Sequence, residues 1–503
     1  MTNKNREAIF NMSAADFRTA GHQLVEQLAG FLDTLPERRV APETTTESVV
    51  KLLRPQTMPE NGKEANSLLA ETAELLFNNS TFNGHPNFMA YITSSAAPIG
   101  ALGDFLAAAI NANVGSWQLA PMATEIEKQT VCWIAELIGY PTNSAGLMLS
   151  GGNMANITAF WTARRAKATW DLRQHGLNHP DAHKMTVYAS KTVHTWIDKA
   201  AELSGLGLDA VRQIPTNERF EMNTAVLRTK IEEDIAAGYL PFMVVGTAGT
   251  VSTGAVDPLS EIAAICREYG LWFHVDGAYG AFAAMLPESP DELHNLGLAD
   301  SVALDPHKWL YAPLEAGCLL VKEPRRLVDT FSFHPDYYHF DEAESDKVNF
   351  YEYGPQNSRG FRALKVWLGL RQAGRQGYRQ MLRDDIALAR MLYDLVEADN
   401  QFEAFSHNLS ITNFRYVPQD LPDDFPQREA YLNELNTAVM EKLRREGQAF
   451  ISNAFIDGKF SLRACVVNFR TTAVEIERIP RLIAQYGKVL DTALRSQTMM
   501  TTV

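Results

Sequence analysis

LWFHVD, residues 271–276, is a short apolar run that ends in an aspartate. Five similar runs lie around it, separated by longer stretches with helical spacing: MTVYAS (185–190), AVRQI (210–214), PFMVVG (241–246), DSVALD (300–305) and GCLLVK (317–322). One intervening stretch, 257–269, opens with Asp-Pro and stops before Gly270, as helices do. Short strands that alternate with crossover helices predict an α/β fold with a mostly parallel central sheet covered on both faces.

The chain divides into three regions that differ in their pattern of apolar residues. Residues 1–88 carry apolar side chains at helical spacing, and a region this long and thin must pack on something else. Residues 89–370 contain the alternating strands and helices. Residues 371–503 begin with a helix-rich stretch and contain two more strands, 411–417 and 460–469, which is typical of a small α+β domain.

Composition limits the possible partners. The 503 residues include 46 Lys and Arg against 60 Asp and Glu, a formal net charge of −14. This acidity argues against nucleic acid or an anionic membrane as the main partner. Four scattered cysteines do not form a disulfide framework, and no apolar stretch has the length of a signal-peptide core or of a membrane helix. The sequence therefore predicts a soluble, cytoplasmic protein.

Two polar side chains follow runs of the predicted sheet. Asp276 ends the run LWFHVD, and Lys308 lies four residues beyond the run SVAL. Ligands of open α/β sheets bind at the carboxyl ends of the strands, so both groups should reach one crevice. A single Asp or Lys after a strand is usually ordinary loop chemistry. However, the Pro, His and Trp of DPHKW (305–309) would fix and partly desolvate the amine, which lowers its pKa and makes it a nucleophile.

A loop of small residues and a histidine lie at two other predicted strand ends. The loop SGGN (150–153) precedes a predicted helix at 154–167, and free backbone N–H groups at a helix N-terminus suit a phosphate. A tight turn with a helix cap would have the same sequence. The loop is not a Walker loop, and the chain has no Gly-x-Gly-x-x-Gly fingerprint for a dinucleotide. His194 follows the run at 185–190.

These groups match the needs of one cofactor. Pyridoxal phosphate requires an amine for its aldehyde, a carboxylate for its pyridine nitrogen, a planar group against its ring and donors for its phosphate. Lys308, Asp276, His194 and the SGGN loop supply each of these once. No metal site is predicted, because His179 and His183 are separated by a proline and lack an HExxH pattern. A serine hydrolase elbow, Gly-x-Ser-x-Gly, is also missing.

Seven motifs, in order, resemble the group II pyridoxal phosphate-dependent amino acid decarboxylases: HPNFMAYITSS (85–95), APMATEIEKQ (120–129), SGGNMANITA (150–159), GTAGTVSTGAVDPL (246–259), HVDGAYG (274–280), DPHKWL (305–310) and SRGFRALKVW (358–367). Within this family the chain is most similar to the aromatic L-amino acid decarboxylases. The stretches SGGNMANITA and GTAGT resemble bacterial tryptophan decarboxylases in particular.

The resemblance implies a type I aminotransferase-like fold, built as an obligate homodimer with shared active sites at the interface. In such a molecule residues 1–88 would be a dimerisation arm that wraps the partner. Residues 89–370 would be the large cofactor-binding domain, and residues 371–503 the small C-terminal domain.

The resemblance also implies a role for single residues. Lys308 would bond to the cofactor, Asp276 would pair with the pyridine nitrogen, and His194 would stack on the ring. Tyr337, in HPDYYH, would deliver a proton to the α-carbon of the substrate. The other implied cofactor-binding residues are Gly151, Gly152, Asn153, Thr250, Ala278, His307 and Ser358, with Ser358 reaching the phosphate from the neighbouring subunit. The implied substrate-binding residues are Tyr91, Ser94, Asn113 and Gly115.

Two departures from the family pattern stand out. Asp305 replaces an asparagine that contacts the phosphate in some members, and a carboxylate would repel that group. Asn113 and Gly115 stand where animal members carry bulkier apolar side chains. The substrate pocket is therefore expected to be wider or more polar, which would suit an indole ring.

The implied reaction is decarboxylation of an aromatic L-amino acid (tryptophan, tyrosine, phenylalanine or DOPA) to its amine and carbon dioxide. An aromatic aldehyde synthase and a decarboxylase of glutamate or valine are alternatives, as is a catalytically silent binding protein. Retention of Tyr337 and His194 favours plain decarboxylation over aldehyde formation. The intact Lys308 and Asp276 argue against a silent homologue.

Overall fold

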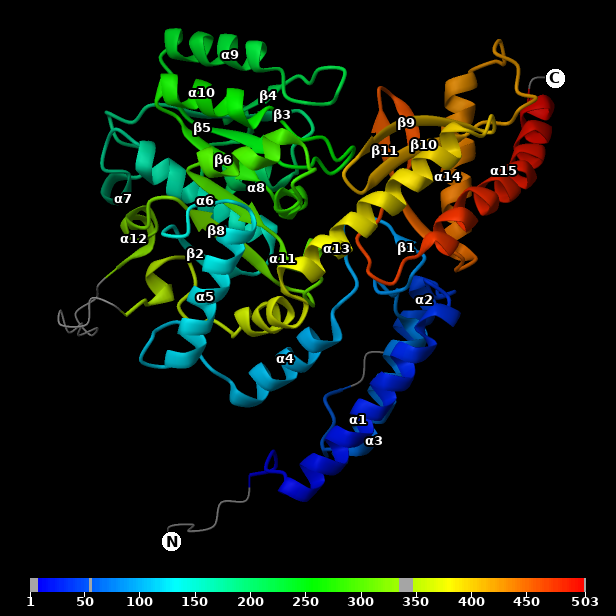
Figure 1. Cartoon of the computed structure of the whole chain (residues 1–503), viewed down its shortest axis with the longest axis horizontal. Helices are drawn as coiled ribbons and strands as arrows, with labels where there is room; N and C mark the ends of the chain where they lie inside the picture. Colours follow the sequence, from blue (N-terminus) through cyan, green and yellow to red (C-terminus); the bar gives the residue numbers. More distant parts are fainter. Residues whose placement is uncertain (1–7, 54–56, 334–346, 502–503) are drawn as a thin grey trace.

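Two β-sheets joined by one long helix form the body of the computed structural model, which describes residues 8–53, 57–333 and 347–501 (Figure 1). The larger sheet has seven strands in the order β2-β8-β7-β6-β5-β3-β4. The pairs between β7 and β4 are parallel, whereas β8 runs antiparallel to both β2 and β7. Its strands are β2 (Ala145–Leu149), β3 (Met185–Ser190), β4 (Val211–Ile214), β5 (Leu240–Thr247), β6 (Trp272–Asp276), β7 (Ser301–Leu304) and β8 (Gly317–Val321).

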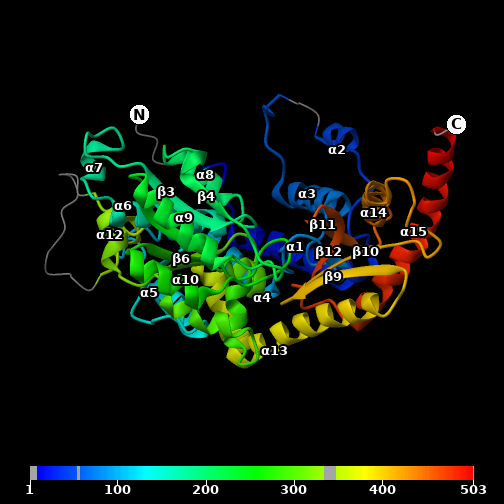
Figure 2. The same cartoon turned by 90° about the horizontal axis from the view of Figure 1, so that it is seen from above.

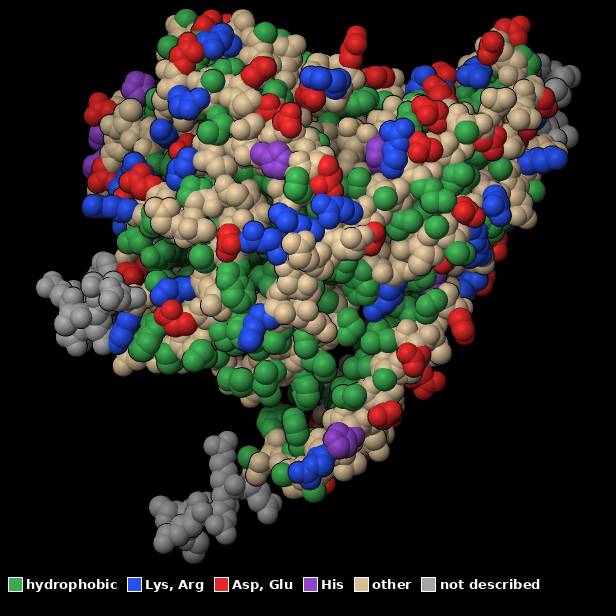
Figure 3. Space-filling view, in the orientation of Figure 1, with side chains coloured by type: hydrophobic (Ala, Val, Ile, Leu, Met, Phe, Trp, Pro, Cys, Tyr) green, Lys and Arg blue, Asp and Glu red, His purple; other side chains and the backbone are tan. Residues whose placement is uncertain are grey.

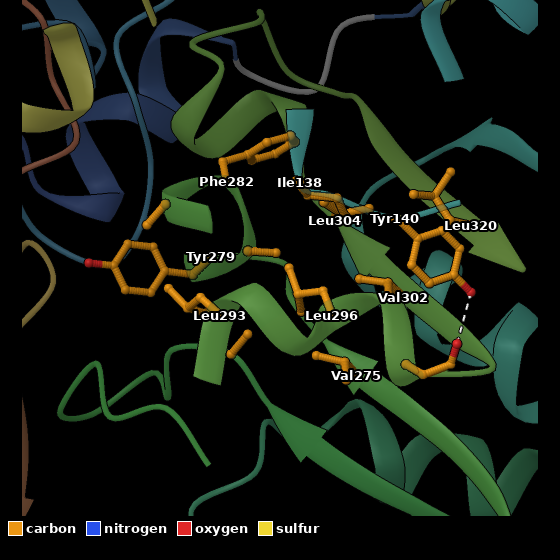
Figure 4. Packing of buried hydrophobic residues seen from close by; sticks show 14 of the residues in the cluster. Ile138, Tyr140, Val275, Tyr279, Phe282, Leu293, Leu296, Val302, Leu304 and Leu320 are labelled. Atoms are coloured by element: carbon orange, nitrogen blue, oxygen red, sulfur yellow. Dashed lines mark hydrogen bonds between the residues drawn. The ribbon is translucent and has the colours of Figure 1, made fainter. Parts of the chain in front are cut away.

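Helices cover both faces of this sheet, and the side chains of single strands show why. On β6, Phe273 and Val275 belong to one buried cluster with Ile262, whereas Trp272 belongs to a second cluster with Phe160. Figure 4 shows part of the first cluster. The covering helices are α5 (Pro121–Leu137), α6 (Gly152–Lys167), α8 (Trp196–Leu203), α9 (Thr224–Ala236) and α10 (Leu259–Tyr269).

The six apolar runs of the sequence are strands β3 to β8, so the predicted α/β sheet is confirmed. The helix predicted over 257–269 is α10, which ends where Gly270 adopts a left-handed conformation with φ of 68°. The helix predicted from 154 begins two residues earlier, at Gly152. Shorter helical elements complete this part of the chain: α7 (Leu172–His175), η2 (Leu208–Ala210), η3 (Gly280–Met285), η4 (Asp291–Leu298), α11 (Pro306–Trp309), α12 (Arg325–Phe331) and η6 (Phe350–Glu352).

The smaller sheet has the order β1-β11-β12-β10-β9. Its strands are β1 (Phe88–Met89), β9 (Phe402–Asn408), β10 (Ile411–Tyr416), β11 (Phe450–Ile456) and β12 (Lys459–Cys465). The pair β1–β11 is parallel and the other pairs are antiparallel. Helices α14 (Arg428–Arg445) and α15 (Ala473–Thr501) pack on it around a third buried cluster.

Helix α13 (Ala363–Glu397) links the two sheets and contains a break at Gly374, where φ is 63°. It packs on α5 near one end and on β9 and α15 near the other. Figure 2 shows it running from the larger lobe to the smaller one. The domain boundary expected at residue 370 therefore lies inside a helix that both lobes share.

The N-terminal region forms a helical arm that extends away from the two sheets (Figure 1). Helices α1 (Ala14–Thr34) and α3 (Ala65–Asn79) pack on each other, and the rings of Phe31 and Phe77 stack 4.6 Å apart. The 3-10 turn η1 (Leu35–Glu37) and helix α2 (Thr46–Leu52) follow α1. Only Ala20 and Ala73 are buried within α1 and α3, so most of their apolar side chains lack a covering layer.

No helix in the described ranges is both long enough and apolar enough to cross a membrane. Among the same residues, His, Cys, Asp and Glu side chains form no cluster that could hold a metal ion.

Candidate active site

One pocket lies at the carboxyl ends of β5, β6 and β7, beside the N-terminus of α6. It brings together six of the residues that were assigned a site role from the sequence: Gly152, Asn153, His194, Asp276, Ala278 and Lys308. The remaining lining residues are Ile92, Asn156, Thr247, Gly249, Val251, Tyr279 and Asp305. A lysine, a carboxylate and an imidazole therefore face one space next to a helix N-terminus.

Lys308 lies on the short helix α11, directly after β7. Its Nζ is 3.2 Å from Oδ2 of Asp305. The next residue, Trp309, is fully buried; its Nε1 donates to Oδ2 of Asp385 at 2.8 Å, and its ring stacks on Tyr279 at 4.9 Å. These contacts fix the turn that carries the amine, as expected from the motif DPHKW.

Contacts of Ser94 and His307, outside the pocket, also stabilise this turn. The hydroxyl of Ser94 donates to the backbone carbonyl of His307 at 2.6 Å. Nδ1 of His307 lies 2.8 Å from the carbonyl oxygen of Ala316, and burial lowers the pKa of this histidine. Neither residue lines the pocket within one chain, so their contacts position Lys308.

Asp276 ends β6 and is only 6% exposed, although it lines the pocket. Two donors hold its carboxylate. Nε1 of Trp196 donates to Oδ2 at 2.7 Å, and the backbone N–H of Ala278 donates to Oδ1 at 3.2 Å. A buried carboxylate needs such donors to offset the loss of its hydration.

His194 lies between β3 and α8, and its Nδ1 accepts from the backbone N–H of Trp196 at 3.3 Å. Desolvation of the imidazole lowers the pKa of His194, partly opposed by Asp276, although the residue as a whole keeps exposed surface. A neutral ring with an acceptor at Nδ1 carries its hydrogen on Nε2.

The loop before α6 depends on two glycines. Gly151 has φ of 95°, a conformation that side chains disfavour. A Cβ on Gly152 would lie 2.6 Å from Oδ2 of Asp305, so that position has no room for one. The start of α6 therefore presents unpaired backbone N–H groups at the pocket wall, which suits an anion such as a phosphate.

Asp305 lies where this anion would approach. It is 3% exposed, and its Oδ1 has no hydrogen-bond partner among the described residues. Its Oδ2 faces both Gly152 and Lys308. The negative charge of the Asp305 carboxylate is thus offset by the amine of Lys308, which lies in the same pocket wall.

Two other expected cofactor residues, Thr250 and Ser358, lie outside the pocket, and the expected proton donor Tyr337 lies outside the described ranges. Thr250 is fully buried and its hydroxyl pairs with that of Thr253 at 2.9 Å, while its neighbours Gly249 and Val251 line the pocket. Ser358 is exposed and precedes α13, so within one chain it does not reach the site. Tyr337 lies outside the described residues.

The expected substrate residues also lie outside the pocket of a single chain. Tyr91 is 60% exposed, and its ring meets that of Phe450 edge to face. Oδ1 of Asn113 accepts from the backbone N–H groups of Gly115 (3.1 Å) and Arg359 (3.0 Å). A Cβ on Gly115 would lie 2.2 Å from the carbonyl oxygen of Asn357. Asn113 and Gly115 thus hold the loop 111–117 against the segment before α13.

Sequence reasoning missed six pocket residues, Ile92, Asn156, Thr247, Gly249, Val251 and Tyr279. Each lies inside one of the seven motifs, one to three residues from a residue that was singled out. The hydroxyl of Tyr279 pairs with Ser410 at 2.7 Å, and Figure 4 shows its ring at the edge of the buried cluster with the oxygen pointing away. Tyr279 therefore connects the pocket to the smaller lobe.

The sheet order and the pocket define the class of the molecule, which is that of the type I pyridoxal phosphate enzymes. The pyridoxal-dependent decarboxylase conserved domain matches residues 47–417. The chain belongs to this family and is a pyridoxal phosphate-dependent carboxy-lyase.

Individual relatives cover nearly the whole chain. An aromatic-L-amino-acid decarboxylase of Bacillus atrophaeus is 33% identical over 93% of this chain and 95% of its own length. A phenylacetaldehyde synthase of Petunia hybrida is 31% identical over 90% of each. Among solved structures, Oryza sativa TDC with PLP and tryptamine has a TM-score of 0.88 at 27% identity, covering 96% of this chain and 100% of that one.

Proposed function

We propose that this enzyme decarboxylates an aromatic L-amino acid (tryptophan, tyrosine, phenylalanine or DOPA) to the corresponding amine and carbon dioxide. The observation that carries the proposal is the convergence of Lys308, Asp276 and His194 in one pocket at a helix N-terminus. The Bacillus atrophaeus relative supports an aromatic substrate.

The described residues fit the cofactor. Lys308 supplies the amine that bonds to its aldehyde, and Asp276 is aimed into the pocket to pair with the pyridine nitrogen. The start of α6 at Gly152 would offer its backbone N–H groups to the phosphate. His194 and Ala278 would cover the two faces of the ring.

Bound pyridoxal phosphate supplies an electron sink for the pair of electrons left when carbon dioxide departs. Asp276 keeps the proton on the pyridine nitrogen, which makes that sink effective. Lys308 would hold the cofactor through its amine and would take part in proton transfer. Tyr337 would deliver the proton to the α-carbon.

Apolar residues of the pocket support a substrate with an aromatic side chain. Ile92 and Val251 line the pocket together with Tyr279. Asn113 and Gly115 would widen the substrate side of the site in the assembled enzyme. Tyr91 and Ser94, which lie within two residues of Ile92 in the sequence, are the other proposed substrate-binding residues. A wide pocket favours tryptophan among the four substrates.

Aldehyde formation is the second candidate, because the Petunia hybrida relative is a phenylacetaldehyde synthase at 31% identity. In that reaction oxygen takes the place of the proton at the α-carbon. The presence of both Tyr337 and His194 in this chain favours protonation and thus the amine.

A substrate panel tests the proposal directly. The holoenzyme is incubated with tryptophan, tyrosine, phenylalanine, DOPA, glutamate and valine, and carbon dioxide, amine, aldehyde and peroxide are measured. We expect carbon dioxide and amine from an aromatic substrate, and neither from a Lys308→Ala variant. Preference for glutamate or valine would overturn the aromatic assignment, and aldehyde with peroxide would support the second candidate.

A homodimer follows from the same proposal. Exposed apolar side chains of α4 (Pro98–Ile110) face outward beside the arm of α1 and α3, and Figure 3 shows hydrophobic side chains gathered over this part of the surface. A second copy would cover them, and its Ser358 would approach the phosphate of this chain's site. We also assign the enzyme to the cytoplasm, since its four cysteines are free thiols.

A further inference from the structure

Trp196, the first residue of α8, is fully buried and touches two groups of the candidate active site. Its indole Nε1 donates to Oδ2 of Asp276 at 2.7 Å. Its backbone N–H donates to Nδ1 of His194 at 3.3 Å. A single residue outside the pocket therefore holds both the carboxylate and the imidazole that line it.

The indole itself is held rigidly. Its ring meets the ring of His274 edge to face, with centroids 5.9 Å apart and an interplanar angle of 86°. His274 is completely buried between Ser301, at 2.8 Å from Nδ1, and Asn156, at 2.7 Å from Nε2. Burial lowers the pKa of His274 to about 4, so this support stays neutral near neutral pH.

The hydrogen bonds of this support have a consistent direction. Nε1 of Trp272 donates to the hydroxyl of Ser301 at 2.9 Å, which leaves that hydroxyl free to donate to Nδ1 of His274. Nε2 of His274 then donates to Oδ1 of Asn156, a residue of the pocket wall. The indole of Trp196 thus packs against a network in which these donors and acceptors are paired. This contact fixes the direction of the indole N–H.

We infer that Trp196 is a positioning residue that aims Asp276 at the pyridine nitrogen of the cofactor. The inference rests on the proposed cofactor site. The indole N–H donates to one oxygen of Asp276, and the backbone N–H of Ala278 donates to the other. The carboxylate therefore cannot rotate away from the pocket. Because the indole donates to a buried carboxylate, this hydrogen bond is of the strong, charge-assisted kind.

The test compares two cofactors on the full-length apo enzyme. Dissociation constants are measured for pyridoxal phosphate and for its analogue with a carbon atom in place of the pyridine nitrogen. We expect Trp196→Phe to weaken binding of pyridoxal phosphate by about tenfold. Binding of the carbon analogue should change by less than about twofold, because that ring offers Asp276 no N–H.

Trp170→Phe is the matched control. Trp170 is also buried and also uses its Nε1, which donates to the carbonyl oxygen of Gly176 at 2.8 Å, but it does not line the pocket. This variant should leave the ratio of the two dissociation constants unchanged. If Trp196→Phe does not fold, replacement of Trp196 by benzothienylalanine removes the N–H and keeps the shape of the ring system.

Each outcome has a clear meaning. Equal weakening of both cofactors by the change at Trp196 would overturn the positioning role, because it would indicate a general packing defect. Unchanged binding of both cofactors would overturn it as well. Failure of the unmodified enzyme to bind pyridoxal phosphate would instead contradict the proposed cofactor site, so the two failures are distinguishable.

Discussion

Gly152 shows how little space one position of the site allows. A Cβ there would lie 2.6 Å from Oδ2 of Asp305 and 3.2 Å from Cβ of Ala278. We predict that Gly152→Ala weakens pyridoxal phosphate binding by about tenfold or more, because the start of α6 and the turn of Asp305 must move apart. Titration of the apo enzyme with the cofactor measures this. Gly21→Ala on α1, where nothing lies within 4 Å, is the control, and an equal loss there would contradict the steric explanation.

Asp305 places a negative charge beside the proposed phosphate position. We predict that Asp305→Asn strengthens binding of inorganic phosphate to the apo enzyme by about fivefold, the effect of about 1 kcal/mol of removed repulsion. Equilibrium dialysis with labelled phosphate measures the change. Weaker binding would mean that Asp305 helps the anion indirectly, by orienting the amine of Lys308 that lies 3.2 Å from it.

Several site residues could be predicted from sequence and others could not. Asp276 and His194 were visible because each follows a recognisable strand, and strand ends of a parallel sheet converge. Trp196 was not visible as their partner. Its bond to Asp276 joins positions 80 residues apart, and only the tertiary fold brings them together.

Helix α13 reaches the active site through Asp385. This fully enclosed carboxylate accepts from Nε1 of Trp309 at 2.8 Å and from the hydroxyl of Tyr311 at 2.7 Å, and burial raises its pKa to about 7. We predict that Asp385→Ala costs about 2 to 4 kcal/mol of stability, because two buried donors lose their acceptor. Urea unfolding of the apo enzyme measures the loss. Asp385→Asn keeps an acceptor oxygen and should cost less, so a larger loss in that variant would contradict the explanation.

Strand β6 carries a buried histidine that makes the fold sensitive to acid. The pKa of His274 falls from 6.5 to about 4 on folding, so between these values the unfolded chain binds a proton that the folded chain does not. The contribution of His274 to stability is therefore complete above pH 6.5 and declines by about 3 kcal/mol as the pH falls to 4.

The pH dependence can be isolated by variants. Urea midpoints are measured from pH 7 to pH 4 for the parent enzyme, for His274→Gln and for His183→Gln, whose histidine is exposed. We expect a shallower decline only in His274→Gln. Parallel curves for all three proteins would contradict the assignment to His274.

Element order was predictable, whereas strand direction and lobe boundaries were not. The apolar runs marked β3 to β8 correctly, but nothing in GCLLVK indicates that β8 runs against β7 and β2. The boundary expected at residue 370 follows a change in the pattern of apolar residues. Helix α13 nevertheless continues through it, because its two ends pack on different lobes. Strand β1 is only two residues long and carries no alternating pattern.

At the scale of the whole molecule, the exposed apolar surface over α4 is where the proposed dimer would form. Leu106 is 49% exposed and lies on the same helix as Phe105, which stacks on Phe17 of the arm. If the proposed dimer forms through this surface, we predict that Leu106→Glu converts it to monomers and lowers turnover at least tenfold, because an isolated charge cannot be buried in an interface. Light scattering coupled to gel filtration measures the mass. Leu203→Glu, at a 71% exposed position on α8, should leave the proposed dimer intact.

The pairing of Phe88 in β1 with Phe450 in β11 has a consequence for how the protein is made. A ribosome adding about 5–20 residues per second needs about 20 to 70 s to make the roughly 360 residues between them. During that interval the large sheet can form, since all its strands precede β9. Strand β1 of the small sheet stays unpaired over the same time. Nascent chains that stall before Phe450 therefore keep Phe88 and Met89 without their strand partner.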